Sequence, residues 1–313
     1  MRPQMGASPA SMQAKAPHGA EGSFISERAP VAEEVTASVS PVPIKRKVSP
    51  EKLPPEELAL RRKMGQVSFA PLDFDKIKDF LLNAKDETQV CATLQALRWR
   101  VTKAPHRSAK REILHSYVHY DILGCAGKGA PVLHPLLDGS PRTRVYATNL
   151  VNALASECVG RSYLLQRVEG KSLVSRLADV LKGEKGDTGL RQNALGALQK
   201  FSLRRRPQSE MIAIDMVRWI ANTLRAEGEA LSEYTMEYAT ALLMNLSLRS
   251  SGKDKCEELG GEVLQVLIDL LENENPQVRT YVNGTLYSIF TRASLKEAAN
   301  ALGMHEMLQY LIQ

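Results

Sequence analysis

The stretch Ala239-Thr-Ala-Leu-Leu-Met-Asn-Leu-Ser247 decides the fold of this chain, because similar stretches occupy residues 147–155, 194–202 and 282–290. Each copy carries one pair of apolar residues at the same place, and these pairs are Val151/Leu154, Leu198/Phe201, Leu243/Leu246 and Leu286/Ile289. Successive pairs are 47, 45 and 43 residues apart. Helical units of about 40–47 residues are typical of armadillo and HEAT repeats. The recurrence therefore predicts a repeat protein.

The segments around these copies have helical rather than strand periodicity. Apolar residues in the stretch 77–84 recur at i, i+3, i+4 and i+7, which indicates a buried helical stripe. Asp138-Gly139 is not flanked by alternating apolar residues, so no hairpin is predicted there. An earlier helix precedes each copy, at residues 132–137, 173–181, 216–224 and 263–271. We therefore predict an all-α, armadillo-like α-solenoid, whose units stack because one unit cannot bury its apolar face alone.

Residues 1–70 differ in composition from the rest of the chain. They hold nine of the 16 prolines, and their only aromatic residues are Phe24 and Phe69. Such a segment buries too little apolar surface to offset the entropy lost on ordering. We predict a disordered Pro/Ala/Ser-rich tail over residues 1–70, a helical N-terminal cap or atypical repeat over residues 71–129, and armadillo-like repeats over residues 130–313.

Composition excludes several classes of partner and compartment. The net charge of +6 is shared evenly by the tail and the remainder, so no basic patch for nucleic acid is expected. The chain has no run of about 18 apolar residues and no secretory signal, so we expect no membrane insertion. Its four cysteines lack CxxC spacing, which is typical of thiols in a reducing compartment. We expect a protein of the cytoplasm, nucleus or cytoskeleton.

Nothing in the sequence indicates an enzyme, a cofactor or a metal site. His115 and His119 have a spacing that can chelate a metal, but no third ligand lies nearby in sequence. The glycine-rich stretch Gly183–Gly189 lacks the order GxxxxGK[ST] and lies between helices, so we interpret it as an inter-helix turn. No serine or cysteine has the context of an activated nucleophile.

An arginine follows three of the repeated helices, and these arginines are Arg204, Arg249 and Arg292, spaced 45 and 43 residues apart. Cations favour the negative end of a helix dipole, so the arginines could serve as repeated caps. Arginine also makes bidentate bonds to carboxylates, so they could instead line one rim of the solenoid and contact acidic segments of a partner.

Four longer strings resemble one family in particular: Leu94-Gln-Ala-Leu-Arg-Trp-Arg100, residues 195–205, residues 237–250 and Tyr281-Val-Asn-Gly-Thr-Leu-Tyr-Ser-Ile289. From about Asp73 onward the chain is similar to the family of the LisH-domain-containing armadillo-repeat protein nine. The resemblance implies a scaffold of the basal body, centriole and cilium that supports cilium assembly, stability and Hedgehog-type signalling. Its implied partners are ciliary and basal-body proteins, including microtubule-associated ones. Family members begin with a LisH dimerisation motif and a coiled coil, which residues 1–70 do not show, so LisH-mediated dimerisation is not implied here.

The alternative is an importin-like or catenin-like armadillo peptide receptor in nuclear transport or adhesion. Such receptors resemble this chain in their repeats, and they hold peptides through an asparagine on the third helix of successive repeats. The equivalent positions here are Ala153, Lys200, Asn245 and Ser288, so only one of them is asparagine. Because the asparagine is missing from three of the four positions, the sequence counts against this class of receptor. Lys200, Asn245 and Ser288 remain candidate partner-binding residues on the expected concave surface.

Replacing Phe201 or Leu243 by alanine should lower the free energy of unfolding by about 2–5 kcal/mol, because both side chains are expected to be fully buried between helices. Denaturant unfolding of each variant measures this loss. A side chain found on the solvent surface, or a β-sheet in the repeat region, would contradict the predicted fold.

Overall fold

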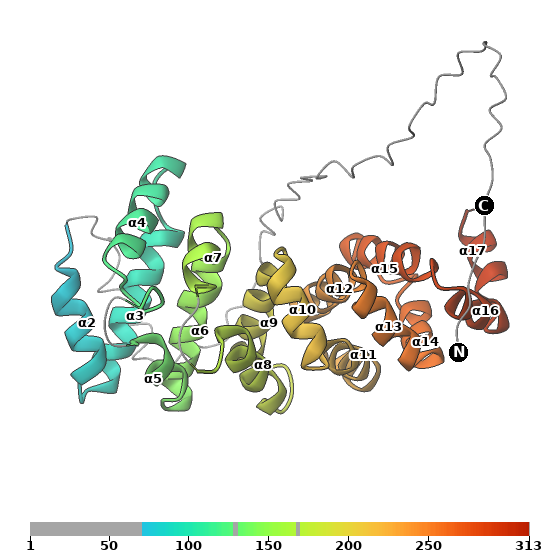
Figure 1. Cartoon of the computed structure of the whole chain (residues 1–313), viewed down its shortest axis with the longest axis horizontal. Coiled ribbons are helices and arrows are strands. Elements are labelled where there is room, and N and C mark those ends of the chain that lie inside the picture. Colours follow the sequence, from blue (N-terminus) through green and yellow to red (C-terminus); the bar gives the residue numbers. More distant parts are fainter. Residues whose placement is uncertain (1–70, 128–130, 167–169, 313) are drawn as a thin grey trace, which may run out of the picture. The chain divides into compact units, whose positions relative to one another are not determined.

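The computed structural model describes residues 71–127, 131–166 and 170–312, and helices are the only regular elements within those ranges (Figure 1). The all-α prediction is therefore confirmed for the part of the chain that the structure describes. Residues 1–70 lie outside it, so the disordered tail and the boundary at residue 70 stay predictions.

The repeating unit has three helices, which we call the first, the second and the long third helix. The first helices are α4 (Arg107–His119), α7 (Cys158–Leu164), α10 (Arg205–Ala213), α13 (Ser250–Leu259) and α16 (Ala293–Ala301). The second helices are α2 (Phe74–Asn83), α5 (Leu133–Leu137), α8 (Leu173–Gly183), α11 (Met216–Glu227), α14 (Gly261–Asp269) and α17 (Met304–Ile312). The third helices are α3 (Glu87–Thr102), α6 (Pro141–Ala155), α9 (Gly189–Phe201), α12 (Glu233–Ser247) and α15 (Pro276–Ile289). A 3-10 turn, η1 (Gly228–Ala230), joins α11 to α12.

The sequence predicted the second and third helices of the four repeats, but it missed the first helices α7, α10, α13 and α16. Each long third helix begins at a polar residue whose side chain accepts a hydrogen bond from the first turn, and these caps are Asp86, Ser140, Thr188, Ser232 and Asn275. The helices α7, α10, α13 and α16 begin without any such side-chain bond. Since an N-cap residue is a main sequence signal for a helix start, these short helices lack one of the usual markers.

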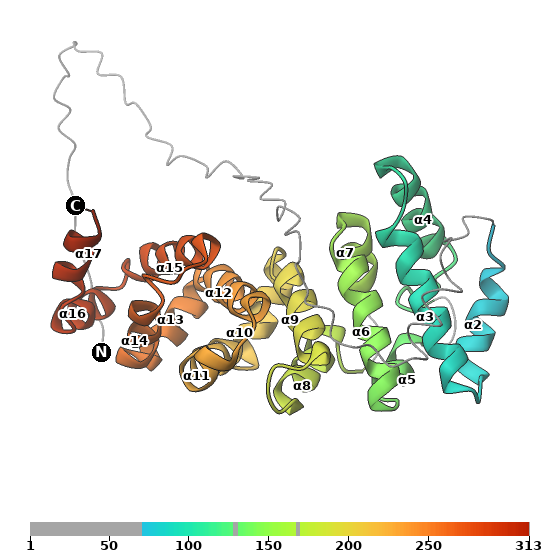
Figure 2. The same cartoon turned by 180° about the vertical axis from the view of Figure 1, so that it is seen from behind.

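The long third helices pack against one another in chain order, from α3 through α6, α9 and α12 to α15, and we call them the long-helix row (Figures 1 and 2). The helix α3, which precedes the four copies, packs against α6 as α6 packs against α9. The apolar pairs that recur in the sequence all lie in the core, and Phe201 and Leu243 are both 0% exposed. The expected burial of these side chains is therefore confirmed.

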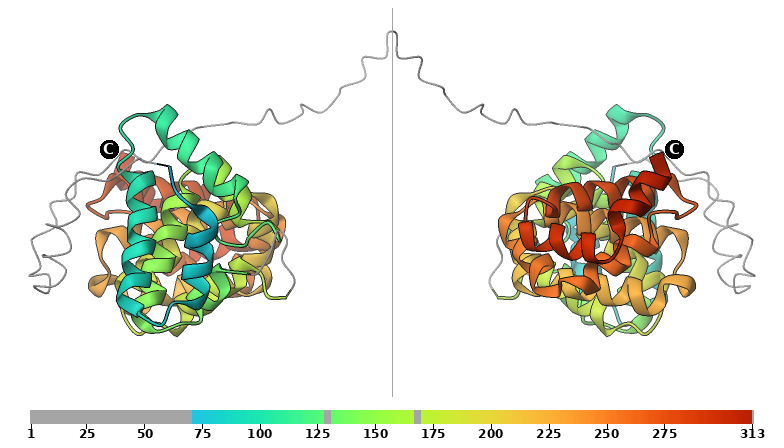
Figure 3. Two further views of the ribbon diagram at one scale, coloured as in Figure 1. Left: turned by 90° about the vertical axis from the view of Figure 1, so that its left-hand side faces the viewer. Right: turned by 90° about the vertical axis from the view of Figure 1, so that its right-hand side faces the viewer.

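The two ends of the row differ (Figure 3). At one end, α2 covers α3, and at the other, α16 and α17 follow α15. Tyr287 of α15 is 86% exposed. The equivalent residue of α12, Met244, contacts α15 at Gly284. Whereas α15 covers this side of α12, no described helix covers the equivalent side of α15. Tyr287 is therefore exposed.

Two first helices cross the end of the preceding long helix at a glycine. A β-carbon on Gly160 of α7 would overlap the carbonyl oxygen of Leu154, and one on Gly252 of α13 would overlap that of Leu246. At Gly252 it would also lie 2.8 Å from the carbonyl carbon of Leu246. Backbone atoms cannot rotate away as a side chain can, so only glycine fits at these crossings.

Gly252→Ala should therefore lower the free energy of unfolding by about 1–3 kcal/mol or more, as overpacking of a tight contact does. The matched control is Gly189→Ala, since a β-carbon at Gly189 has nothing within 4 Å. Urea unfolding measures both. Equal midpoints for the two variants would contradict the close crossing.

The glycine-rich turn between α8 and α9 holds two helix starts in place. Thr188 caps α9 with its side chain. Asp187 accepts hydrogen bonds from the backbone N–H of Ser232 at 2.7 Å and from Oγ1 of Thr235 at 2.6 Å, at the start of α12. Burial raises the pKa of Asp187, but the hydrogen bonds from Ser232, Thr235 and Gln192 outweigh burial and hold this pKa below its ordinary value. This turn therefore joins neighbouring repeats.

Asp187→Asn should cost about 2 kcal/mol at pH 7, because hydrogen bonds to a charged acceptor are lost. The pKa of Asp187 is lower in the folded state than in the unfolded state. Its contribution to the free energy of unfolding is therefore complete above the unfolded-state pKa of about 3.9, and it is lost as the pH falls through the folded-state pKa. Urea unfolding at pH 7 and at about pH 3 should show the difference between wild type and variant shrinking with acid. A difference that grows on acidification would contradict this assignment.

Candidate functional site

A cluster of polar and aromatic side chains lies on the long-helix row where α6, α9 and α12 meet. Lys200 of α9 donates hydrogen bonds to the backbone oxygen of Asn152, at 3.2 Å, and to its side-chain oxygen. The Nζ atom of Lys200 also lies 5.7 Å from the ring centroid of Tyr238 in α12. A cation at this distance from an aromatic face is attracted to it. Lys200 therefore connects all three helices.

The aromatic part of the cluster comes from the start of α12. The rings of Tyr234 and Tyr238 stack, with centroids 4.1 Å apart and an interplanar angle of 23°. Nδ2 of Asn152 donates to the hydroxyl of Tyr234 at 3.4 Å and to Oδ1 of Asn193 at 3.1 Å. A β-carbon on Gly196 would overlap the Tyr234 hydroxyl, so this glycine lets Tyr234 reach across α9 to α6. We call Asn152, Gly196, Lys200, Tyr234 and Tyr238 the tyrosine–lysine cluster.

The structure places the three predicted contact residues in different surroundings. Lys200 is half-buried within the cluster. Asn245 is 8% exposed, and its Nδ2 donates to Oγ of Ser202 at 2.8 Å. Ser288 is 6% exposed and donates to the backbone oxygen of Ser247 at 2.8 Å. Asn245 and Ser288 thus bond the preceding long helix. Partner contact by Lys200, Asn245 or Ser288 stays a prediction.

The three predicted arginines lie at the junctions between a long helix and the next first helix. Arg204, Arg249 and Arg292 are the residues that precede α10, α13 and α16, and their backbone N–H groups bond to carbonyls in the last turn of the long helix before. Arg292 pairs with Asp254 and lies 3.8 Å from Glu257. Arg204 instead donates to Sγ of Cys158 at 3.0 Å. Equivalent positions in sequence therefore have different partners.

Sequence reasoning missed the tyrosines of the cluster. Tyr234 and Tyr238 are spaced i, i+4, which places them on one face of a helix. They lie just before the stretch that begins at Ala239, so the repeat comparison did not include them. The contact of Tyr234 with Asn152 crosses 82 residues, and no local pattern indicates it.

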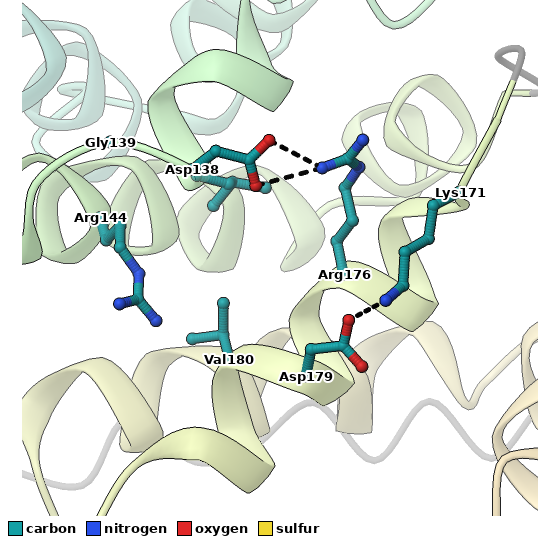
Figure 4. A pocket seen from close by; sticks show the side chains of 8 residues that line it. Asp138, Gly139, Arg144, Lys171, Arg176, Asp179 and Val180 are labelled. Atoms are coloured by element: carbon teal, nitrogen blue, oxygen red, sulfur yellow. Dashed lines mark hydrogen bonds and ion pairs between the residues drawn. The ribbon is translucent and has the colours of Figure 1, made fainter.

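A pocket of about 370 Å³ lies between the α5–α6 turn and α8 (Figure 4). Its cations are each close to an acidic side chain. Nη1 of Arg176 donates to both carboxylate oxygens of Asp138, at 2.9 and 3.1 Å, and Lys171 pairs with Asp179 (Figure 4). Arg144 lies 4.0 Å from Glu184. Because these charges are already compensated, we interpret the pocket as a contact between repeats rather than an anion site.

The cysteines and histidines have structural contacts. Cys125 and Cys256 are buried free thiols, and burial raises the pKa of each to about 12. His115 accepts a hydrogen bond from Arg111 at 3.4 Å, and the ring of His119 meets that of Tyr120 at 4.8 Å. Within the described residues, no group of His, Cys, Asp and Glu is arranged to hold a metal ion. In the same ranges no helix has the length and apolar character that a membrane span requires.

The chain matches known proteins in both sequence and fold. Residues 211–313 match the family model for the ARM repeats of LisH domain-containing protein ARMC9. The chain is 42% identical over 253 residues to that protein from Bos taurus, which covers 80% of this chain and 37% of the relative. The human protein is also 42% identical over 253 residues, and the match covers 80% of this chain and 30% of the human protein. The Danio rerio protein is 41% identical over 239 residues, and the match covers 76% of this chain and 29% of the Danio rerio protein. The chain spans about a third of the length of these curated relatives.

Two solved structures share the fold at low sequence identity. An engineered protein has a TM-score of 0.59 and 15% identity, over 78% of this chain and 90% of its own. A structure from work on the interaction between cadherin and beta-catenin has a TM-score of 0.55 and 18% identity, over 72% of this chain and 44% of its own. These likenesses show an armadillo-like fold. Through its three-helix repeats and their sequence identity to the curated relatives, this chain belongs to the family of LisH domain-containing protein ARMC9.

Proposed function

We propose that this chain is a non-enzymatic, protein-binding scaffold of the basal body and cilium. There it supports cilium assembly, stability and Hedgehog-type signalling by holding ciliary and basal-body proteins. Membership of the ARMC9 family supports the proposal, because the long strings beginning at Leu94, Leu195, Glu237 and Tyr281 resemble a ciliary family. The repeat architecture also supports it, since stacked repeats expose an extended surface that suits protein partners.

The tyrosine–lysine cluster is the observation that carries the binding part of this proposal. Tyrosine contributes large contact area at low cost in conformational entropy and is frequent among the residues that dominate binding. Tyr234 is already held by stacking on Tyr238 and by the hydrogen bond from Asn152, so its side chain loses little conformational entropy when a partner binds. Lys200 adds a cation beside Tyr238. The cluster therefore suits a partner that presents carbonyl or carboxylate groups.

The catenin-like fold favours one second candidate, a peptide receptor in nuclear transport or adhesion. Such a receptor needs asparagine amides that are free to bond to the backbone of an extended peptide. Asn245 is the one asparagine at the equivalent positions, and its Nδ2 already donates to Ser202 within the stack. We therefore favour the scaffold over the peptide receptor.

A tagged copy should localise to basal bodies and cilia, and a complete knockout should shorten or destabilise cilia and blunt their signalling. The variant Lys200→Ala/Tyr238→Ala should fail to restore ciliary length, because losing an aromatic contact residue costs about 2 kcal/mol or more of binding. The matched control Tyr287→Ala/Lys296→Ala removes the same residue types from exposed positions away from the cluster, and it should restore cilia.

Thermal unfolding of both variants checks that each is folded. Normal cilia in the knockout, or a tagged protein confined to the nucleus or to cell junctions, would contradict the scaffold and favour the peptide receptor. Equal rescue by both variants would leave the ciliary role standing and exclude the tyrosine–lysine cluster as its contact surface.

A further inference from the structure

Two equivalent leucines are exposed at the ends of neighbouring long helices. Leu203 follows α9 and is 56% exposed, and Leu248 follows α12 and is 59% exposed. An arginine comes directly after each one, Arg204 and Arg249. A single exposed leucine is ordinary on a protein surface, but here two occupy the same place in adjacent repeats. We call Leu203, Leu248 and the arginines Arg204, Arg205, Arg206 and Arg249 the leucine–arginine rim.

Buried hydrogen bonds hold the two halves of this rim together. Ser202, directly before Leu203, accepts the side-chain amide of Asn245 at 2.8 Å. Nε2 of Gln208 donates to the backbone oxygen of Asn245 at 3.2 Å. The helices α9 and α12 pack side by side, and packed helices lie about 8–10 Å apart. The two leucines are therefore about 10 Å apart, which is about one three-residue turn of a polyproline-II segment.

The charge of the rim is not compensated within the described residues. No described acidic side chain makes an ion pair with Arg204, Arg205, Arg206 or Arg249. Nor do residues 199–209 and 246–253 contain any Asp or Glu.

Nearby acidic residues are engaged elsewhere. Glu157 pairs with Lys110, and Glu210 accepts hydrogen bonds from Ser172 and Ser175. In the next repeat, by contrast, Arg292 is neutralised by Asp254. The positive charge thus remains available where the exposed leucines are, and not one repeat further along.

We propose that the leucine–arginine rim binds an acidic segment of a partner protein in the extended polyproline-II conformation, which places apolar residues three positions apart on one face. Its apolar side chains cover Leu203 and Leu248, and its carboxylates pair with Arg205, Arg206 and Arg249. Arginine suits this role because its guanidinium can bond to both oxygens of one carboxylate. The inference rests on the proposed scaffold function, but it uses a different surface from the tyrosine–lysine cluster.

The test measures binding of a fluorescein-labelled peptide, made of four Asp-Glu-Leu units, to the full chain by fluorescence anisotropy. Replacing each leucine of the peptide by serine should weaken binding about tenfold, and so should Leu203→Ala/Leu248→Ala in the protein. Arg205→Gln/Arg249→Gln should also weaken binding about tenfold and reduce the loss of affinity between about 50 and about 300 mM salt.

The matched control is Leu82→Ala/Arg225→Gln, which makes the same two kinds of change at exposed residues of α2 and α11 and should bind as wild type does. Thermal unfolding confirms that every variant is folded. No binding of the acidic peptide, equal loss in the control, or equal binding of the serine peptide would overturn the proposal. A different result would assign the rim to a membrane surface instead. In that case, vesicles containing phosphatidylserine would bind the wild type and bind the rim variants less, while the peptide would not bind.

Lys200→Ala/Tyr238→Ala should leave peptide binding unchanged. The two proposals are therefore separable: a rim that fails this test overturns the acidic-segment proposal alone, and the ciliary rescue experiment decides the scaffold function.

Discussion

Close approach of neighbouring long helices is the constraint on which the rest of this structure depends. One repeat cannot bury its own apolar face, so its core exists only once the next repeat packs against it. Three of the four repeated stretches begin with a small residue, and each of these residues is at most 1% exposed: Ala147, Ala194 and Ala239. Glycines at 160 and 252 let the first helices cross the ends of the long helices. Larger side chains at these buried positions would need space that the packed helices do not leave.

Polar contacts then decide how the repeats align. A buried polar group costs free energy unless it is hydrogen-bonded, so a misaligned pair of repeats would leave these groups unpaired. Asn245 pairs with Ser202, and Ser288 with Ser247, each across one step of the row. Arg191, whose side chain is 2% exposed, pairs with Glu227 at 2.6 Å and has its guanidinium 5.2 Å from the ring centre of Trp219. Apolar burial holds the stack together, and these bonds fix its register.

Sequence periodicity predicted most of the fold and little of the candidate site. The long and second helices were predictable because their apolar residues recur at helical spacing. The starts of the long helices also carry polar caps. The site depends on contacts between repeats, such as Tyr234 with Asn152, which no local pattern indicates. The arginines show the same limit. Arg249 and Arg292 hold equivalent positions, but Ser209 and Ile212 stand where Asp254 and Glu257 stand one repeat later. The identity of the arginine could be predicted, but its charge environment could not.

The two candidate surfaces share the helices α9 and α12 but differ in chemistry. The tyrosine–lysine cluster is aromatic and internally bonded, whereas the leucine–arginine rim is apolar and positively charged without a described acidic partner. The bond between Asn245 and Ser202 lies beside the rim, so a change at Asn245 would act on the rim by altering the alignment of α9 and α12. Asn245 then matters for binding without touching the partner, because it sets the distance between two surface positions that belong to different repeats.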